Sequence, residues 1–268
     1  MDNRPIGVFD SGLGGLTVVK EIKKVLPNEK IIYLGDTARV PYGTRSKEVI
    51  TKFAVEDVNY LLKKNVKCIV IACNSVSSVA TKTLKDKFDI PILDVISPTC
   101  KYIAKNTNIK RVGIIGTEAT IKSNAYGKTI NKFNKRIQVF QNAAPLLVPL
   151  VEEGETISIF TYQIVEKYLK PLIDRNVEMV VLGCTHYPVL LPIINKIVGK
   201  DIKIVDPAEY VSKSLRAYLK GENLLSNVRI EPIDFFAVTD LTEGFIKQIN
   251  IFFSKDRKDK LVKILLTK

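Results

Sequence analysis

Short apolar runs recur along the chain, and most end in a polar or glycine-containing turn that leads into a segment with helical spacing. Runs that are apolar throughout are typical of strands buried on both faces of a parallel sheet. The pattern predicts strands at residues 5–9, 30–34, 68–71, 90–95, 111–117, 137–140, 179–182, 202–206 and 233–238. It also predicts helices at 14–26, 46–64, 76–87, 207–220 and 241–253, and a loop at 37–44.

The second half of the chain repeats the plan of the first. The strands at 111–117 and 137–140 match residues 5–11 and 31–34 at a shift of about 106 residues. The strand before Cys184 then matches the strand before Cys73, and the next strand of each half follows in the same order. Four strands in one order predict a duplicated α/β unit.

The duplication predicts two lobes. We expect each to be a flavodoxin-like α/β lobe of parallel sheet with flanking helices, and the two to be related by pseudo-two-fold symmetry with the active site in the cleft between them. The predicted bounds are 1–97 for the first lobe and 98–206 for the second. Residues 207–268 are expected to pack back on the first lobe.

Composition places the chain among globular proteins. It has 268 residues, of which 46% are hydrophobic and 26% charged, enough for one large core or two smaller ones. No apolar run reaches the roughly 18 residues that span a bilayer, and the N-terminus lacks the basic-then-apolar order of a signal peptide. We therefore expect no membrane association and a cytoplasmic location, where the four cysteines stay reduced.

The net charge of +13 is spread over many lysines rather than gathered in one stretch. One local cluster comprises Lys255, Arg257, Lys258, Lys260 and Lys263. Because net charge bears on solubility and non-specific binding, the simplest interpretation is a solvated lysine-rich surface, with a nucleic-acid or acidic-partner surface as the alternative. Nucleic acid is not the expected partner, whereas an anionic small substrate would be favoured by this field.

Two cysteines stand where chemistry is expected. Cys73 and Cys184 each follow a predicted buried strand, and ligands of open α/β sheets bind at the carboxyl ends of the strands. A single free cysteine in such a place usually packs as a small hydrophobic residue. Two in matched settings, facing one cleft from opposite lobes, would instead supply the opposed bases that racemisation needs.

The turn at residues 10–17 indicates anion binding, because it is rich in glycine and joins a strand to a helix. Nucleotide binding is therefore an alternative to racemisation. A dinucleotide motif fails in detail: its third glycine position is Thr17, and Asp10 would point a carboxylate at the pyrophosphate. A non-catalytic binding module with a flavodoxin-like or nucleotide-binding fold stays an alternative.

Two other cysteine chemistries fit less well. A nucleophilic hydrolase needs a cysteine activated by a histidine, and His186, the one histidine, lies two residues from Cys184 without an evident oxyanion motif. A zinc site would need Cys68 beside Cys73, but residues five apart on one strand are about 16 Å apart and face opposite ways. No metal is expected.

Five motifs, in order along the chain, resemble the cofactor-independent glutamate racemases. They are residues 10–16 (Asp-Ser-Gly-Leu-Gly-Gly-Leu), 40–43 (Val-Pro-Tyr-Gly), 72–75 (Ala-Cys-Asn-Ser), 148–154 (Val-Pro-Leu-Val-Glu-Glu-Gly) and 183–188 (Gly-Cys-Thr-His-Tyr-Pro). The resemblance runs from the first strand to about Thr239. It implies interconversion of L- and D-glutamate without pyridoxal phosphate or metal, a supply of D-glutamate for peptidoglycan, and a homodimer.

The resemblance also implies residue roles. Cys73 would exchange the proton of D-glutamate and Cys184 that of L-glutamate, with Asp10 assisting Cys73, and Glu152 and His186 assisting Cys184. The implied substrate-binding residues are Asp10, Ser11, Pro41, Tyr42, Gly43, Asn74, Ser75, Thr117, Thr120, Thr185 and His186. Seen alone, Ser11, Ser75 and Thr117 would be helix caps. Since a thiolate must act as the base, we expect helix N-termini after both cysteines to lower the thiol pKa values.

The chain departs from the family pattern at two places. Ser75 stands where the family usually has threonine, which keeps the hydroxyl and loses a methyl group. The stretch beyond Phe253 is unusually basic and has no counterpart in the pattern.

Overall fold

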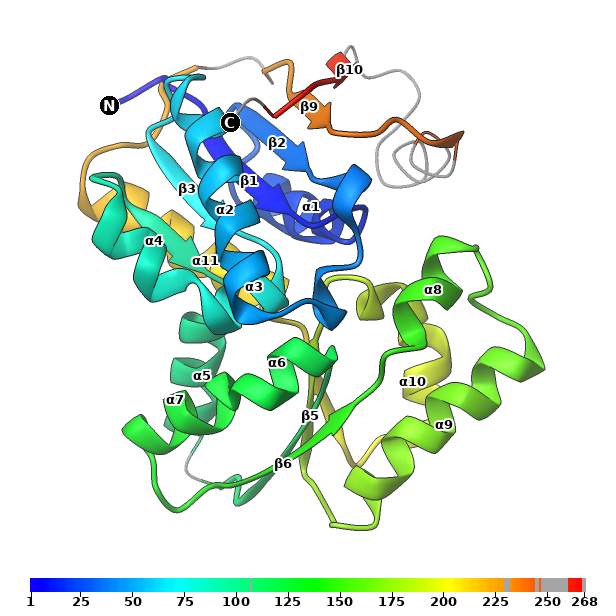
Figure 1. Cartoon of the computed structure of the whole chain (residues 1–268). Helices are drawn as coiled ribbons and strands as arrows, with labels where there is room; N and C mark the ends of the chain where they lie inside the picture. The colour runs from blue at the N-terminus through cyan, green and yellow to red at the C-terminus, as the bar shows by residue number, and fades with distance from the viewer. Residues whose placement is uncertain (107, 229–231, 244–245, 247–259, 267–268) are drawn as a thin grey trace.

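Two parallel sheets form the centre of the protein. The computed structural model describes residues 1–106, 108–228, 232–243, 246 and 260–266. One sheet has the order β10-β9-β2-β1-β3-β4 and the other the order β6-β5-β7-β8. Figure 1 shows them in separate lobes with helices packed around each. The strand bounds are β1 Ile6–Asp10, β2 Ile31–Gly35, β3 Cys68–Ile71, β4 Ile92–Asp94, β5 Arg111–Gly116, β6 Gln138–Ala143, β7 Met179–Gly183, β8 Lys203–Val205, β9 Phe235–Val238 and β10 Lys260–Lys263.

The two sheets repeat one topology. In each, the first strand lies between the second and the third, and the fourth lies beyond the third. Every described pair of neighbouring strands is parallel. The predicted α/β class with two parallel sheets is therefore confirmed, whereas the exact lobe bounds and the pseudo-two-fold relation stay predictions. Strand β9 pairs with β2, so a segment from the end of the chain lies in the first sheet.

Helices cover both sheets, and one of them returns from the second lobe. Helix α11 follows the last strand of the second lobe yet packs against α1 and α5. No helix in the described part of the chain is long and apolar enough to cross a membrane. The helix bounds are α1 Gly15–Val25, α2 Lys47–Leu62, α3 Asn74–Val79, α4 Thr81–Lys87, α5 Ile96–Lys105, α6 Glu118–Ser123, α7 Ala125–Phe133, α8 Leu147–Glu152, α9 Ile159–Ile173, α10 Leu191–Val198 and α11 Pro207–Gly221.

The helix predicted at 76–87 was wrong in its start and its continuity. It begins at Asn74, directly after Cys73, and it is two helices that meet at Ala80. The hydroxyl of Thr81 donates to the carbonyl of Ser77, and such back-bonding by serine and threonine side chains bends helices.

Other segments also differ from the sequence predictions. The predicted loop at 37–44 contains two 3-10 turns, Thr37–Arg39 and Tyr42–Thr44. Strand β10 was missed because two of its four residues are lysines, and so little apolar pattern marks it. The helix predicted at 241–253 lies mostly outside the described residues, as does most of the basic cluster.

One hydrophobic core runs through both lobes. The same cluster contains Val8 and Val70 from the first sheet and Ile114 and Val181 from the second. Helices α1, α5, α7 and α11 join these sheets, since α11 contacts α1 and α5, and α5 contacts α7. This shared core sets how the carboxyl ends of the two sheets face each other.

Candidate active site

Both predicted cysteines lie just past the carboxyl ends of their strands and line one cavity. Cys73 comes two residues after β3, and Cys184 directly follows β7. The cavity is nearly closed, with a volume of about 20 Å³, and both thiols are buried in its wall. The residues that line it are Ser11, Val40, Pro41, Tyr42, Gly43, Cys73, Asn74, Ser75, Thr117, Val148, Cys184, Thr185 and His186.

Cys73 sits in a dry setting. Its Sγ lies 3.7 Å from Ser11 Oγ, and the residue caps α3 without a side-chain hydrogen bond to the helix. Burial raises the pKa of Cys73 to about 12, and the neighbouring charge of Asp10 adds to the rise. The helix N-terminus does lower the pKa of this thiol, as expected, through the backbone N–H of Val76, but burial raises it more, so the expected net lowering was wrong.

Cys184 sits in a charged setting. Its Sγ lies 3.7 Å from His186 Nδ1, and the Nε2 of that ring lies 3.3 Å from Glu152 Oε1. Burial lowers the pKa of His186, but its contacts with Cys184 and Glu152 outweigh burial and raise it to about 10. The imidazole is therefore cationic at neutral pH and places a positive charge beside Cys184 Sγ.

No helix begins directly after Cys184, contrary to the sequence prediction. The chain forms a turn and the 3-10 segment Tyr187–Leu190 before α10 begins at Leu191. A helix dipole acts mainly within its first turn, so α10 is too far along the chain to act on the thiol. The charge beside Cys184 comes from His186 instead.

Asp10 occupies the anion site that the glycine-rich turn provides. Its Oδ2 accepts hydrogen bonds from the backbone N–H groups of Gly12 and Gly15, both at 3.1 Å. Its Oδ1 accepts one from Thr185 Oγ1 at 3.3 Å, across the two lobes. Burial raises the pKa of Asp10, partly offset by the charge of His186. The turn thus holds a carboxylate of its own chain, and Asp10 is not part of the cavity lining.

Hydroxyl groups from both lobes meet at the cavity wall. Ser75 Oγ lies 2.9 Å from Thr117 Oγ1, and Thr117 also caps α6. Thr120 lies behind Thr117, with the two Oγ1 atoms 3.0 Å apart, and does not reach the cavity surface. The Tyr42 hydroxyl donates to Asp36, so the ring forms wall while the hydroxyl group is engaged elsewhere.

Three residues at or beside the cavity were not singled out from the sequence. Val40 and Val148 add apolar lining, and both lie within the motifs at 40–43 and 148–154, which could have indicated them. Tyr126 donates to Asn74 Oδ1 at 2.6 Å from beneath the wall. No local motif marks Tyr126, because its role depends on the packing of α7 against α3.

The described residues contain no group of three or more His, Cys, Asp or Glu side chains placed to hold a metal ion. Cys68 and Cys100 are buried away from this cavity, and burial raises the pKa of each thiol. They are packing residues.

The fold and the paired thiols define a class of enzyme, and comparison with known proteins identifies it. Residues 6–214 match the family profile described as Asp/Glu/Hydantoin racemase, and the chain belongs to that family. Within it, the chain groups with the glutamate racemases. It is 43% identical to the glutamate racemase of Geobacter metallireducens over 249 residues, which are 93% of this chain and 92% of the relative.

Solved structures agree with this placement. A glutamate racemase from Francisella tularensis, crystallised in complex with D-glutamate, superimposes with a TM-score of 0.91 at 40% identity over 99% of each chain. The glutamate racemase isoform RacE1 from Bacillus anthracis superimposes with a TM-score of 0.94 at 33% identity over 100% of each chain.

Proposed function

We propose that this racemase interconverts L- and D-glutamate by proton transfer between its two opposed thiols, without a cofactor. The observation that carries the proposal is that Cys73 and Cys184, which follow strands of two different sheets, line the same nearly closed cavity. Racemisation needs a base on one face of Cα and an acid on the other, and two side chains on opposite lobes supply that pair.

The two settings suit different protonation states. A thiolate on Cys184, stabilised by the cationic His186, takes the α-proton of L-glutamate: the Cα–H bond breaks, an S–H bond forms, and the electron pair stays on a planar carbanion. Cys73, whose raised pKa keeps it a thiol, delivers its proton to the opposite face and becomes the thiolate. The reverse reaction exchanges these roles, and the charge of Asp10 disfavours a lasting thiolate on Cys73.

Short polar side chains would hold the substrate. Ser11, Asn74, Ser75, Thr117 and Thr185 bring hydroxyl and amide groups to the cavity from both lobes. Groups of this kind can hydrogen-bond the carboxylates and the ammonium group of glutamate. The backbone at Tyr42 and Gly43 adds polar groups that need no side chain. Thr120 would act indirectly, by orienting Thr117.

The cellular role extends the same proposal. Family membership supports a supply of D-glutamate for peptidoglycan and cell-wall synthesis, in the cytoplasm. We also propose that the enzyme works as a homodimer, which sedimentation at micromolar concentration would test.

The decisive experiment follows the α-proton. The purified chain is treated with a chelator, stripped of pyridoxal phosphate and incubated with L-glutamate in deuterium oxide. We expect deuterium at Cα together with loss of optical rotation. Activity that disappears on this treatment and returns with a metal or pyridoxal phosphate would disprove cofactor independence. No exchange at all would favour a binding protein.

A further inference from the structure

The substrate cavity is nearly closed, so substrate needs a route into it. Its volume of about 20 Å³ is room for about one water molecule and too little for glutamate. Two solvent-facing hollows flank it between the lobes. The basic pocket, about 680 Å³, includes Arg45, Lys47, Lys122 and Lys128. The mixed pocket, about 180 Å³, lies between α1 and the segment around Pro188.

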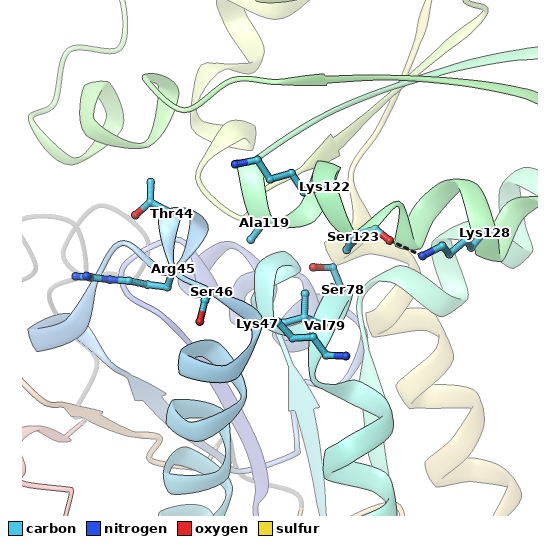
Figure 2. Close-up of a pocket in the computed structure, with 10 residues that line it drawn as sticks. All are labelled: Thr44, Arg45, Ser46, Lys47, Ser78, Val79, Ala119, Lys122, Ser123 and Lys128. Atoms are coloured by element: carbon cyan, nitrogen blue, oxygen red, sulfur yellow. Dashed lines mark hydrogen bonds between the residues drawn. The ribbon is translucent and has the colours of Figure 1, made fainter.

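The basic pocket carries charge of one sign. Figure 2 shows its four basic residues: Arg45 comes from the segment before α2, Lys47 from the first position of α2, and Lys122 and Lys128 from α6 and α7. None of its ten described lining residues is acidic, although Glu118 just outside pairs with Lys122 at 2.7 Å. A glutamate anion, with two carboxylates and one ammonium group, is attracted to such a surface.

The mixed pocket offers no such bias. Lys20 and Lys24 line it together with Glu21 and Asp206, and Lys24 pairs with Glu21. Because the two signs balance, this side neither attracts nor repels a small anion strongly.

The wall between the basic pocket and the cavity is thin and polar. Gly43, Ser75 and Thr117 line the cavity, and each is followed within three residues by a residue that lines the pocket. The hydrogen bond between Ser75 and Thr117 crosses the lobes there. Gly43 packs directly against Thr117 of the other lobe, since a Cβ on Gly43 would lie 2.6 Å from Thr117 Cβ. Opening this wall breaks that hydrogen bond and parts α6 from α3 and from the Tyr42–Thr44 turn.

The wall on the other side includes side chains of the hydrophobic core. Between the cavity and the mixed pocket lies a space with essentially no free volume, whose lining combines the polar residues Thr17, Asn74, Thr185 and Asp206 with apolar residues that include Val18, Val95 and Leu182. These three apolar side chains are fully buried or nearly so. Parting the lobes there exposes core side chains to water, which is unfavourable in proportion to the apolar area uncovered.

We propose that glutamate enters and leaves through the basic pocket, which gathers the anion before the wall of Gly43, Ser75 and Thr117 opens. This inference rests on the proposed racemase function.

The first test blocks each hollow in turn. Ala119→Trp narrows the basic pocket and Val189→Trp narrows the mixed pocket. Exchange broadening of the methylene resonances of racemic glutamate gives the association rate, the dissociation rate and Kd. A blocked route slows both rates by one factor and leaves Kd unchanged, since neither end state is altered. We expect Ala119→Trp to slow both about tenfold and Val189→Trp to slow neither.

The second test removes charge at matched sites. Lys47→Gln with Lys122→Gln should lower the association rate about fivefold at 20 mM salt, and the loss should vanish at 500 mM salt because exposed charges are screened. Lys20→Gln with Lys24→Gln removes the same charge and should change it less than twofold.

Slowing by Val189→Trp rather than Ala119→Trp, or equal effects of the two lysine pairs, would overturn the inference. The chain contains no tryptophan, so the fluorescence of each introduced indole reports whether that variant is folded. Racemisation by the unmodified chain is measured alongside. If the unmodified chain does not racemise glutamate, the proposed function is refuted. If it does, and the exchange rates are unchanged in the basic-pocket variants, only the access route is refuted.

Discussion

Gly14 approaches the other lobe so closely that a single methyl group should displace the residues beside Cys184. A Cβ on Gly14 would lie 2.3 Å from Thr185 Oγ1 and 2.6 Å from His186 Nδ1. The backbone of Gly14 has φ −58° and ψ −32°, which alanine adopts without strain. The effect of Gly14→Ala is therefore purely steric, and the neighbours must withdraw by about 1 Å to reach ordinary contact.

That displacement has a predictable size. His186 Nδ1 lies 3.7 Å from Cys184 Sγ, so moving the ring weakens the charge that stabilises the thiolate. A misplacement of about 1 Å at catalytic groups costs on the order of 100-fold in rate. We expect kcat/KM of Gly14→Ala to fall about 100-fold in both directions. The free energy of unfolding should fall by about 1–3 kcal/mol, as for other overpacked sites.

Gly221→Ala provides the matched control. Among the described residues, no heavy atom lies within 4 Å of a Cβ added there, at the end of α11. It should keep activity within twofold and gain about 0.4–1 kcal/mol in stability through the unfolded state. Polarimetry with each enantiomer and urea unfolding measure both variants. A folded Gly14→Ala enzyme within threefold of the unmodified rate would refute the steric argument.

Three further predictions follow from the site. Cys73→Ser and Cys184→Ser should each lower the rate of racemisation by about 10²–10⁴-fold. On glutamate analogues that carry a leaving group on the side chain, Cys73→Ser should still catalyse elimination from the L form and Cys184→Ser from the D form. Equal loss of both eliminations in either variant would contradict the two-base assignment. The folded-state pKa of His186 is raised to about 10, so its contribution to stability is fully present below about pH 6.5 and is lost as the pH rises toward 10. The difference in free energy of unfolding between the unmodified chain and His186→Gln, measured by urea titration, should therefore decrease over that pH range. An increase would contradict the raised pKa. Ser75→Ala removes the hydrogen bond to Thr117 and should lower the free energy of unfolding by about 0.5–1.5 kcal/mol. Ser75→Thr keeps the hydroxyl group and should lower it less. Equal losses in the two variants would mean that this hydrogen bond contributes nothing to stability.

Local pattern was sufficient for most of the fold. Uniformly apolar runs marked the strands of both sheets from β1 to β9, and their repeated order indicated the duplication, because burial on both faces leaves a signal in a few adjacent residues. The helix predicted at 46–64 was correct in its start, since the side chain of Ser46 caps α2 by accepting from Val49 N–H within one turn. Strand β10 was missed because its pairing with β9, rather than its own composition, makes it a strand.

Motifs likewise marked the pieces of the site but not their electrostatics. The turn at residues 10–17 was expected to bind an anion, and only the folded chain shows that the anion is the Asp10 carboxylate. The sequence placed a helix after each cysteine and so predicted lowered thiol pKa values. Burial reversed this at Cys73, and His186, held against Cys184 and Glu152, supplies the charge at the other thiol.

The chain by itself therefore determined which residues form strands, which turns carry chemistry and that the plan is used twice, because these depend on neighbours a few positions away. Only the tertiary structure shows that Cys73 and Cys184 share one cavity. It also places Cys73, as a thiol, near the buried carboxylate of Asp10 and places Cys184 against the imidazolium of His186. Finally, it separates the cavity from the basic pocket by a polar wall. The pKa of each thiol depends on burial and on charges that folding brings beside it, Asp10 beside Cys73 and Glu152 behind His186, whereas access depends on how the two lobes pack, and neighbouring positions in the sequence set neither.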